Sequence, residues 1–410
     1  MHNFLGFSKN SDRIVAVCFA DMIRTLGRSS TIILLPIYFL TFRHSSYFII
    51  GLVVAAGYLF AAPFSMMGGT LADRIGRRPL FTVLPMLSAI VFLLMSIEIY
   101  TGIQLWILYL TFIFASPIGT LQGTVDSSVL SDLTQSNERI KAFSLLRLFS
   151  NVGFALGPAL GGFVSTLGYS LLLLVPTAGN LIEELVYLAL VRESMADVRN
   201  EADIRITPGR SLISFPSADR SFMLIIGIIV VASVCLGQWG TTLTLFLSGS
   251  YHLSVARIGL MYSLNGIVVV LFQMPVNRLM AKFHDIDRLA AGVLIYAISF
   301  IMFGLFSVYY LILITTAILT IAENIFSPAV STLISKIAPS NRRGEYFGAY
   351  SAVNAFTSPL FIVFGAFLLT SLAHSPLLIW AIVSLFGFIS SMLFIFSKKK
   401  IPSGRLADYH

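Results

Sequence analysis

Long apolar segments alternate with short polar segments along almost the whole chain. An α-helix needs about 20 apolar residues to cross roughly 30 Å of hydrocarbon, and each apolar segment has about that length or more. The pattern therefore predicts an all-α integral membrane protein with twelve transmembrane helices. The ends of each helix are predicted to within several residues. The predicted spans are 14–40, 48–71, 80–99, 105–131, 143–166, 169–190, 222–247, 258–280, 289–306, 308–335, 346–371 and 376–397.

One longer polar segment, 192–221, divides the spans into two sets of six. We expect residues 1–191 and 222–410 to form two six-helix bundles, the second with a short tail. The two halves carry the same residues at corresponding positions: Leu26-Gly27 corresponds to Leu236-Gly237, and Pro63 and Asp73 correspond to Pro275 and Asp285. Such a repeat predicts a pseudo-two-fold axis along the membrane normal, with a binding cavity between the bundles.

The charges are few and unevenly placed. Charged residues make up 11% of the chain and hydrophobic residues 57%, whereas soluble domains carry about 25% charged residues. If both termini are cytoplasmic, 22 of the 27 lysines and arginines fall on the cytoplasmic side, as the positive-inside rule requires. We therefore expect a multi-pass protein of the plasma membrane, and the net charge of +8 does not indicate nucleic acid.

Two motifs then stand out. The segment after the second span reads G-T-L-A-D-R-I-G-R-R-P-L, with Asp73 among three arginines in a short turn between two apolar segments. The fifth span contains a second motif of closely spaced glycines around a proline. The residues of the two motifs are Gly69, Leu71, Ala72, Asp73, Arg74, Gly76, Arg77, Arg78 and Leu80, and Gly153, Gly157, Pro158, Gly161 and Gly162.

On these residues the chain resembles the major facilitator superfamily over nearly its whole length. The first motif matches the family's loop signature at every specified position, and the second is similar to the signature of the twelve-helix drug:proton antiporters. The resemblance implies alternating access, with Asp73 capping the eleventh helix and Arg77 paired with Asp132. One feature of such antiporters is missing, because no arginine lies between Leu105 and Asp132 in the fourth span.

Both motifs also have simpler interpretations. The charges of the loop would serve orientation alone, although an acid among required glycines and cations is not needed for that purpose. The glycines of the fifth span permit close backbone approach, as small residues do at membrane helix contacts. Pro158 removes a backbone hydrogen bond and can bend the helix. Ordinary helix packing would use these residues in the same way.

Ionisable residues inside the spans are costly unless they face protein or water. Asp21, Arg24 and Arg28 recur at three- and four-residue spacing, so they share one stripe of the first helix. Asp126 and Arg147 lie at comparable depth in the fourth and fifth spans. We expect a network of these charges that lines the first bundle and binds protons; the alternative is a static set of salt bridges that fixes helix packing.

Three further acids lie inside spans. Glu323 is near the middle of the tenth span, where burial would favour its neutral form, so it is a second candidate for proton coupling or else a neutral hydrogen-bonding group. Glu183 and Glu184 lie near the end of the sixth span, where a solvated or snorkelling role is expected.

Polar and aromatic residues of several spans are candidates to line a substrate cavity, although helix packing is as good an explanation for each. They are Tyr38, Gln238, Trp239, Asn265, Gln273 and Asn354.

The sequence thus predicts a secondary active transporter, a monomer in the lipid bilayer, that exports small amphipathic or drug-like molecules in exchange for protons. It indicates no enzyme, cofactor or metal site: there is no G-x-x-x-x-G-K-[ST] loop, and Cys18 and Cys235 lie within apolar spans. A transporter of a sugar or organic anion is the alternative, since buried arginines suit carboxylates. A non-transporting membrane sensor is a third possibility.

Overall fold

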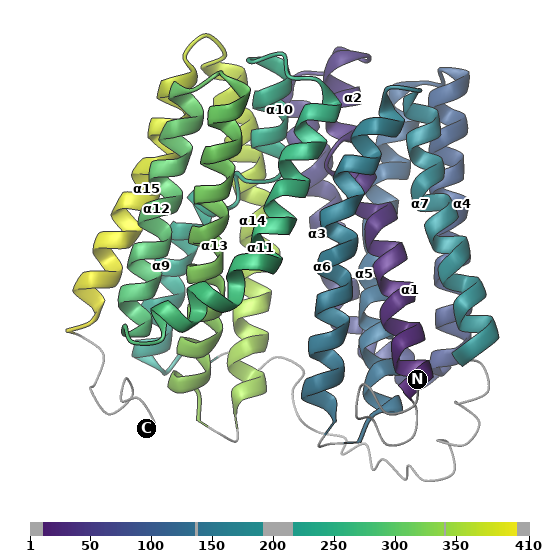
Figure 1. Cartoon of the computed structure of the whole chain (residues 1–410), viewed down its shortest axis with the longest axis horizontal. Helices are drawn as coiled ribbons and strands as arrows, with labels where there is room; N and C mark the ends of the chain where they lie inside the picture. Colours follow the sequence, from purple (N-terminus) through teal and green to yellow (C-terminus); the bar gives the residue numbers. More distant parts are fainter. Residues whose placement is uncertain (1–10, 136–137, 192–215, 340–341, 400–410) are drawn as a thin grey trace. The chain divides into compact units, whose positions relative to one another are not determined.

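The computed structural model describes residues 11–135, 138–191, 216–339 and 342–399, except for the side chains of 66–70, 72–75, 77–78, 140 and 191. Helices account for nearly all of these residues (Figure 1). They are α1 (Ser11–Ile32), α2 (Leu35–Thr41), α3 (Tyr47–Ile75), α4 (Arg77–Thr101), α5 (Leu105–Leu133), α6 (Arg139–Ser165), α7 (Tyr169–Val186), the π-helical turn η1 (Tyr187–Val191), α9 (Arg220–Leu236), α10 (Thr241–Gly249), α11 (Val255–Met280), α12 (Asp285–Leu305), α13 (Tyr309–Ile337), α14 (Arg343–Ser371) and α15 (Pro376–Ser397).

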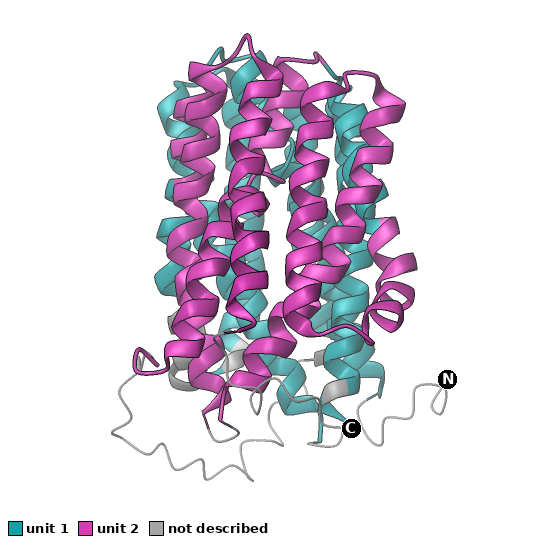
Figure 2. Ribbon diagram, turned by 90° about the vertical axis from the view of Figure 1, so that its left-hand side faces the viewer, with its two compact units in different colours: residues 1–45, 56–206, 253–266 teal, residues 46–55, 207–252, 267–410 magenta. Residues whose placement is uncertain are grey.

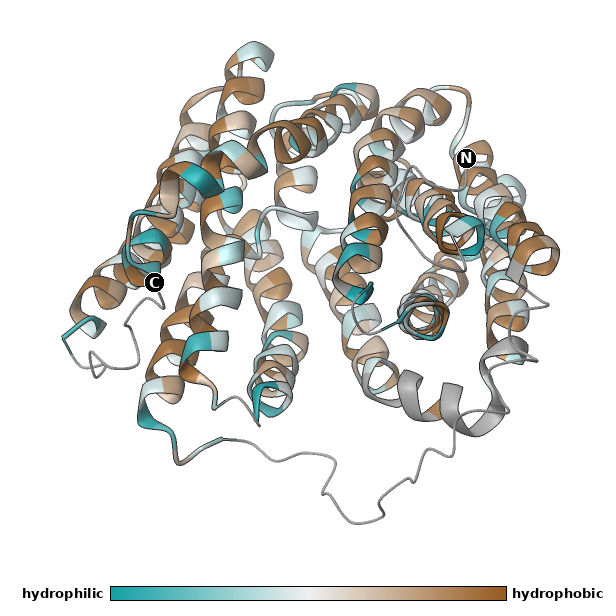
Figure 3. Ribbon diagram, turned by 60° about the horizontal axis from the view of Figure 1, so that its bottom comes forward, coloured by the Kyte–Doolittle hydropathy of each residue, from teal (hydrophilic) through white to brown (hydrophobic). Residues whose placement is uncertain are grey.

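The predicted all-helical membrane architecture is confirmed. Within the described residues, eleven segments are helical, long and apolar enough to cross a membrane, and Figure 3 shows apolar residues along most of their length. The first span, α1 followed by α2, is too polar to be among them because α1 carries Asp21, Arg24 and Arg28. It brings the number of spans to the predicted twelve.

Two spans that were expected to be continuous are broken. The first is interrupted after Ile32, and Pro36 lies in the first turn of α2; proline has no N–H to donate and therefore suits the first turn of a helix. The seventh is interrupted between Gly237 and Gly240, which separate α9 from α10. Glycine costs about 1 kcal/mol relative to alanine within a helix, so two glycines weaken the helix at this point.

The turn between α3 and α4 is tighter than predicted. The predicted spans ended at 71 and began again at 80, but the helices extend to Ile75 and from Arg77. Gly76 alone makes the turn, with φ of 90°, a region that residues with a Cβ rarely adopt. The side chains of Asp73, Arg74, Arg77 and Arg78 are outside the described residues, as is any pairing between Arg77 and Asp132.

The chain forms two compact units, drawn in teal and magenta in Figure 2. The first contains 1–45, 56–206 and 253–266. In it α1 packs against α6 and α7, and α4 packs against α5 and α7. Its core is built from the apolar faces of these helices, including Val17, Phe81 and Val129.

The second unit contains 46–55, 207–252 and 267–410. In it α12 packs against α13 and α15, while α9 packs against α14 and α15. Its core includes Phe222, Leu289 and Phe394. At one end, Asp285 of α12 pairs with Lys336 of α13 at 2.8 Å and with Arg288 at 3.2 Å.

The two units follow the halves of the chain except in two segments. The first part of α11 belongs to the first unit, where a Cβ on Gly259 or Gly266 would come within 3.0 Å of α6. The Oγ of Ser263 also accepts a hydrogen bond from the backbone N–H of Ala159 at 3.0 Å. The first part of α3 belongs to the second unit, where Gly51 lies against α14.

Candidate functional site: a buried charge cluster

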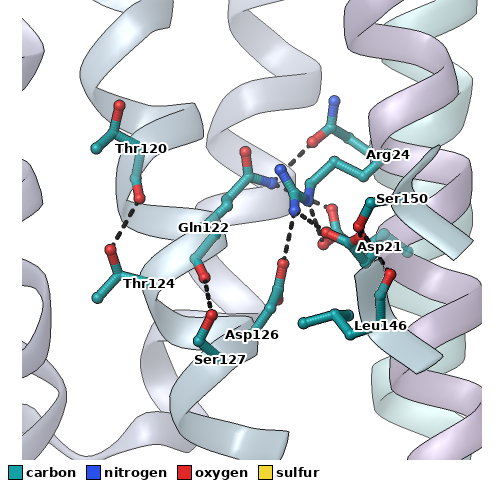
Figure 4. A network of polar contacts seen from close by, with 12 residues as sticks. Asp21, Arg24, Thr120, Gln122, Thr124, Asp126, Ser127, Leu146 and Ser150 are labelled. Atoms are coloured by element: carbon teal, nitrogen blue, oxygen red, sulfur yellow. Dashed lines mark hydrogen bonds and ion pairs between the residues drawn. The ribbon is translucent and has the colours of Figure 1, made fainter. Parts of the chain in front are cut away.

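Among the described residues of the first unit, a cluster of buried charges lies where α1, α5 and α7 meet, and Figure 4 shows Asp21, Arg24 and Asp126 in it. We call Asp21, Arg24, Asp126 and Glu183 the charge cluster. Asp21 and Arg24 are one turn apart on α1, Asp126 comes from α5, and Glu183 comes from the last turn of α7. All four side chains are buried, although each belongs to a residue type that is almost never fully buried unless it is paired.

Arg24 is the centre of the charge cluster. Its Nη2 lies 2.9 Å from Oδ2 of Asp126 and also contacts Oδ1 of Asp21, and its Nε lies 3.2 Å from Oε1 of Glu183. One guanidinium therefore pairs with three carboxylates from three helices. Because a guanidinium presents its N–H groups in a fixed fork, these contacts also fix how the three helices are arranged.

Neutral polar groups engage the remaining carboxylate oxygens. The hydroxyl of Tyr187 donates to Oδ1 of Asp126, and Ser150 of α6 contacts Oδ2 of Asp21. Nε2 of Gln122 donates to Oε2 of Glu183 at 3.2 Å and to Oδ1 of Asn180 at 2.8 Å. Five of the six carboxylate oxygens thus have a hydrogen-bond partner, whereas Oε1 of Glu183 has only its ion pair with Nε of Arg24.

The glycine motif of the fifth span explains how α6 reaches this cluster. Gly153, Gly157 and Gly161 recur every four residues, and a Cβ on any of them would meet the backbone of α1 within 3.0 Å. For Gly157, that Cβ would lie 2.5 Å from the carbonyl oxygen of Leu26. The glycines thus permit a close approach of α6 to α1, which brings Ser150 to Asp21. Gly162 faces α11 instead.

The charge cluster carries more acids than cations. With every group ionised, three carboxylates and one guanidinium have a net charge of −2. Such a charge within a membrane span is expensive, because burial in a low dielectric disfavours uncompensated charge. Proton uptake by the carboxylates is the simplest way to remove it, so the cluster is chemically suited to bind and release protons.

The two other arginines of the predicted network lie outside the charge cluster. Arg28 is one turn beyond Arg24, half-buried, with its guanidinium against Gly119 of α5. It makes no hydrogen bond or ion pair with a described residue. Arg147 of α6 is exposed, and none of its contacts joins it to the charge cluster.

The expectation that Glu183 and Glu184 are solvated is wrong, because their side chains are 0% and 5% exposed. Their position near the end of a span suggested water, but α1 and α5 cover this turn of α7. A weak signal was present in the sequence. Asn180 and Glu183 are three residues apart and Gln122 and Asp126 are four apart, which places each pair on one helix face.

The remaining candidates are spread over both units. Glu323 is half-buried on α13 in the second unit, with Tyr296 of α12 as an electrostatic neighbour. Gln238 is fully buried, and its amide donates to the carbonyls of Val234 and Phe361 at 2.7 and 3.0 Å, so it joins α9 to α14. Tyr38 and Asn265 are also buried, whereas Trp239, Gln273 and Asn354 are half-buried.

No cluster of three or more histidine, cysteine, aspartate or glutamate side chains in the described part of the chain has the geometry to hold a metal ion.

Comparison with known proteins gives a consistent family. The family model described as Major Facilitator Superfamily matches residues 17–309 and 227–408. The chain is 25% identical to multidrug resistance protein MdtH of Cronobacter sakazakii, covering 94% of both chains. It is 24% identical to the uncharacterized MFS-type transporter YqjV of Bacillus subtilis, over 79% of this chain and 78% of that protein.

Solved structures share the fold at low sequence identity. A bacterial homolog of the human lysosomal transporter Spinster superposes with a TM-score of 0.77 at 15% identity, covering 98% of this chain and 100% of that one. The nucleoside transporter NupG superposes with a TM-score of 0.75 at 14% identity, covering 94% and 99%.

Proposed function

The chain belongs to the Major Facilitator Superfamily and is therefore a transporter, and we propose that it exports small amphipathic molecules in exchange for protons. One observation carries the proposal: a single guanidinium, Arg24, is surrounded by three buried carboxylates inside the membrane span. The multidrug names of relatives such as MdtH point to the same class of substrate. We expect both termini to be cytoplasmic, on the distribution of lysines and arginines.

Asp21 is the best candidate for the proton-binding group. The Oγ of Ser150 lies within hydrogen-bond distance both of Oδ2 of Asp21 and of the carbonyl oxygen of Leu146, the latter at 2.9 Å. A serine hydroxyl has only one hydrogen to donate. When Asp21 is ionised, Ser150 donates to it. When Asp21 is protonated, it donates to Ser150, whose hydrogen then turns to Leu146, so both protonation states are hydrogen-bonded.

The neighbours of Glu183 cannot exchange donor and acceptor roles in this way. Nδ2 of Asn180 donates to the carbonyl of Pro176 at 2.7 Å, which turns Oδ1 of Asn180 toward Gln122. Gln122 must therefore present its NH2 group to Asn180 and to Oε2 of Glu183. A proton on that oxygen would face an N–H donor, so this chain of amides leaves Oε2 of Glu183 as an acceptor only.

Protonation must favour one conformation over the other if it is to drive transport. Asp21 joins α1 to α6 through Ser150, and Arg24 joins α1 to α5 and α7. A proton on Asp21 weakens its ion pair with Arg24, which changes how firmly α1 is held within the first unit. We propose that this change biases the alternating-access equilibrium, with the Asp73 loop motif as the gate on the cytoplasmic side.

The test is transport by the reconstituted protein under an imposed pH gradient, with a panel of lipophilic cations, sugars and organic acids as probes. We expect the wild type to respond to the gradient, and Asp21→Asn to retain exchange of the same probe while losing that response. Glu98→Gln is the matched control, because Glu98 is a half-buried acid of α4 that accepts from Thr111 at 2.9 Å, away from the charge cluster.

Two results would contradict the proposal. If wild-type exchange ignores the gradient, the protein is not proton-coupled. If Asp21→Asn keeps the gradient response and Glu323→Gln abolishes it, the proton binds in the second unit, and the charge cluster is a static structural feature.

A further inference from the structure

Arg28 is an unusual cation for the interior of a membrane protein. It lies 17 residues after the start of α1, which is roughly 25 Å along the helix at 1.5 Å per residue, near the middle of the span that α1 and α2 form. Its guanidinium has five N–H donors, and none of them bonds to a described residue. Cations at such a depth normally pair with an acid or a backbone carbonyl.

No group among the described residues neutralises Arg28. The ionisable neighbours that act on it are Arg24 and Tyr58; the first is a cation, and a tyrosine is neutral at neutral pH. The three acids of the charge cluster already pair with Arg24. The charge of Arg24 is therefore compensated by its neighbours, whereas Arg28 bonds to no described residue and keeps its charge and its donors for a ligand.

The surroundings of Arg28 leave it room. Its guanidinium lies directly against Gly119, where a Cβ would come within 3.0 Å of it. One turn along α5, a Cβ on Gly123 would meet nothing within 4 Å. The side chains of Thr120 and Thr124, on the same part of α5, are half-buried. The helix face beside Arg28 is therefore small, polar and open.

We propose that Arg28 binds the anionic group of the transported molecule, a carboxylate, sulfonate or phosphate on an otherwise apolar compound. This inference rests on the proposed transport function and names its substrate class. A guanidinium matches such anions with two parallel N–H···O bonds, which are about twice as strong as neutral hydrogen bonds. The contact would supply the missing counter-ion, while the apolar remainder of the ligand would be recognised less specifically.

The test is a binding measurement on the purified full chain in uncharged detergent. The probes are 2-naphthoate, 2-naphthalenesulfonate and 2-naphthyl phosphate, with 2-naphthamide as the uncharged analogue. We expect the wild type to bind at least one anion more tightly than the amide. Arg28→Gln should weaken binding of that anion roughly 10- to 100-fold, the effect of losing a charged hydrogen-bonding pair, and leave the amide unchanged. Arg28→Lys should restore part of the affinity, because it keeps the charge and loses the fork.

A pair of glycine variants tests the geometry independently. Gly119→Ala places a methyl group against the guanidinium, so it should displace Arg28 and weaken binding of the anion alone. Gly123→Ala adds the same methyl group to open space and should leave binding unchanged. Equal effects of the two variants, equal loss of anion and amide in Arg28→Gln, or no preference of the wild type for any of the anions would each overturn the inference.

Lipid is a second source of the same chemistry, so the measurement is repeated with phosphatidylglycerol. If that lipid binds in an Arg28-dependent manner and none of the naphthyl anions does, Arg28 is a lipid site and the inference is wrong. The proposed function is tested separately, by the gradient response of the wild type with an uncharged probe. Anion binding by Arg28→Gln equal to that of the wild type contradicts only the role of Arg28, whereas the absence of a gradient response in the wild type contradicts the proposed function.

Discussion

Replacing Arg24 with glutamine would leave three buried carboxylates without a cation. Within the described residues, no other cation contacts Asp21, Asp126 or Glu183. Breaking a buried pair by removing one partner costs about 3–5 kcal/mol. The three contacts share one guanidinium, so their contributions are not additive, and we expect the free energy of unfolding to fall by about 3–5 kcal/mol rather than by three times that amount.

Proton uptake by the three acids should limit the loss of stability in Arg24→Gln. A carboxyl group of ordinary pKa, near 4, takes a proton at pH 7 at a cost of about 4 kcal/mol, which is comparable to the cost of leaving it charged and unpaired. The folded variant would then hold more protons than its unfolded state, so its stability should rise as the pH falls. The deficit relative to the wild type should be largest at pH 8 and should shrink towards pH 5.

The assay is thermal unfolding in detergent at pH 5, 6, 7 and 8. Arg43→Gln serves as the control, because Arg43 is a half-buried arginine of the same unit, outside the charge cluster, that donates to the carbonyl of Ile103 at 2.6 Å, and we expect its effect to stay within about 0.5 kcal/mol. An Arg24→Gln protein as stable as the wild type at pH 8, or one with a deficit that does not change with pH, would refute the idea that Arg24 neutralises the three acids.

Three further variants test other parts of the fold. Gly157→Val should destabilise the protein by about 1–3 kcal/mol by forcing α6 away from α1, whereas Gly123→Val, whose Cβ would meet nothing within 4 Å, should do much less; equal effects in thermal unfolding would argue against the close helix contact. Asp285→Asn should lower stability by up to about 3 kcal/mol, since its carboxylate pairs with Lys336 at 2.8 Å, and an unchanged melting temperature would show that this pair contributes nothing. Asp73→Asn should slow transport while membrane insertion, measured by fractionation, stays normal; wild-type rates would exclude a gating role.

Some features of the site were predictable from the sequence because they depend on local spacing. The three-residue spacing of Asp21 and Arg24 placed them on one face of a helix, and the four-residue repeat of the glycines predicted a close helix contact. Hydropathy likewise predicted the spans, because the bilayer sets their length. Each of these features follows from helix geometry within one segment.

Other features could not be predicted because they depend on contacts between distant segments. Glu183 is buried because α1 and α5 cover it, and Arg24 reaches Asp126 across 102 positions of the chain. Pro36 was a local signal for the break after Ile32. The spans were predicted from the length of apolar segments, however, and that length is the same whether or not the helix is interrupted. Whether Arg147 joins the charge cluster depends on which side of α6 faces α1. The glycines of α6 face α1, and Arg147 lies on a different side of that helix.

The missing arginine of the fourth span has a physical counterpart in this arrangement. The acid, Asp126, lies on α5 and the arginine, Arg24, lies on α1, 2.9 Å apart. The attraction between one cation and one anion does not depend on which of two helices carries the cation, so a search along one span cannot find such a pair. We therefore expect Arg24→Asp and Asp126→Arg to abolish gradient-driven transport individually, and the double variant to recover part of it. The acid at position 24 would then lie beside Asp21 and Glu183, and Tyr187 would donate toward a cation, so the recovery is limited. A double variant no better than either single variant would show that the position of the charge, and not only the pairing, is essential.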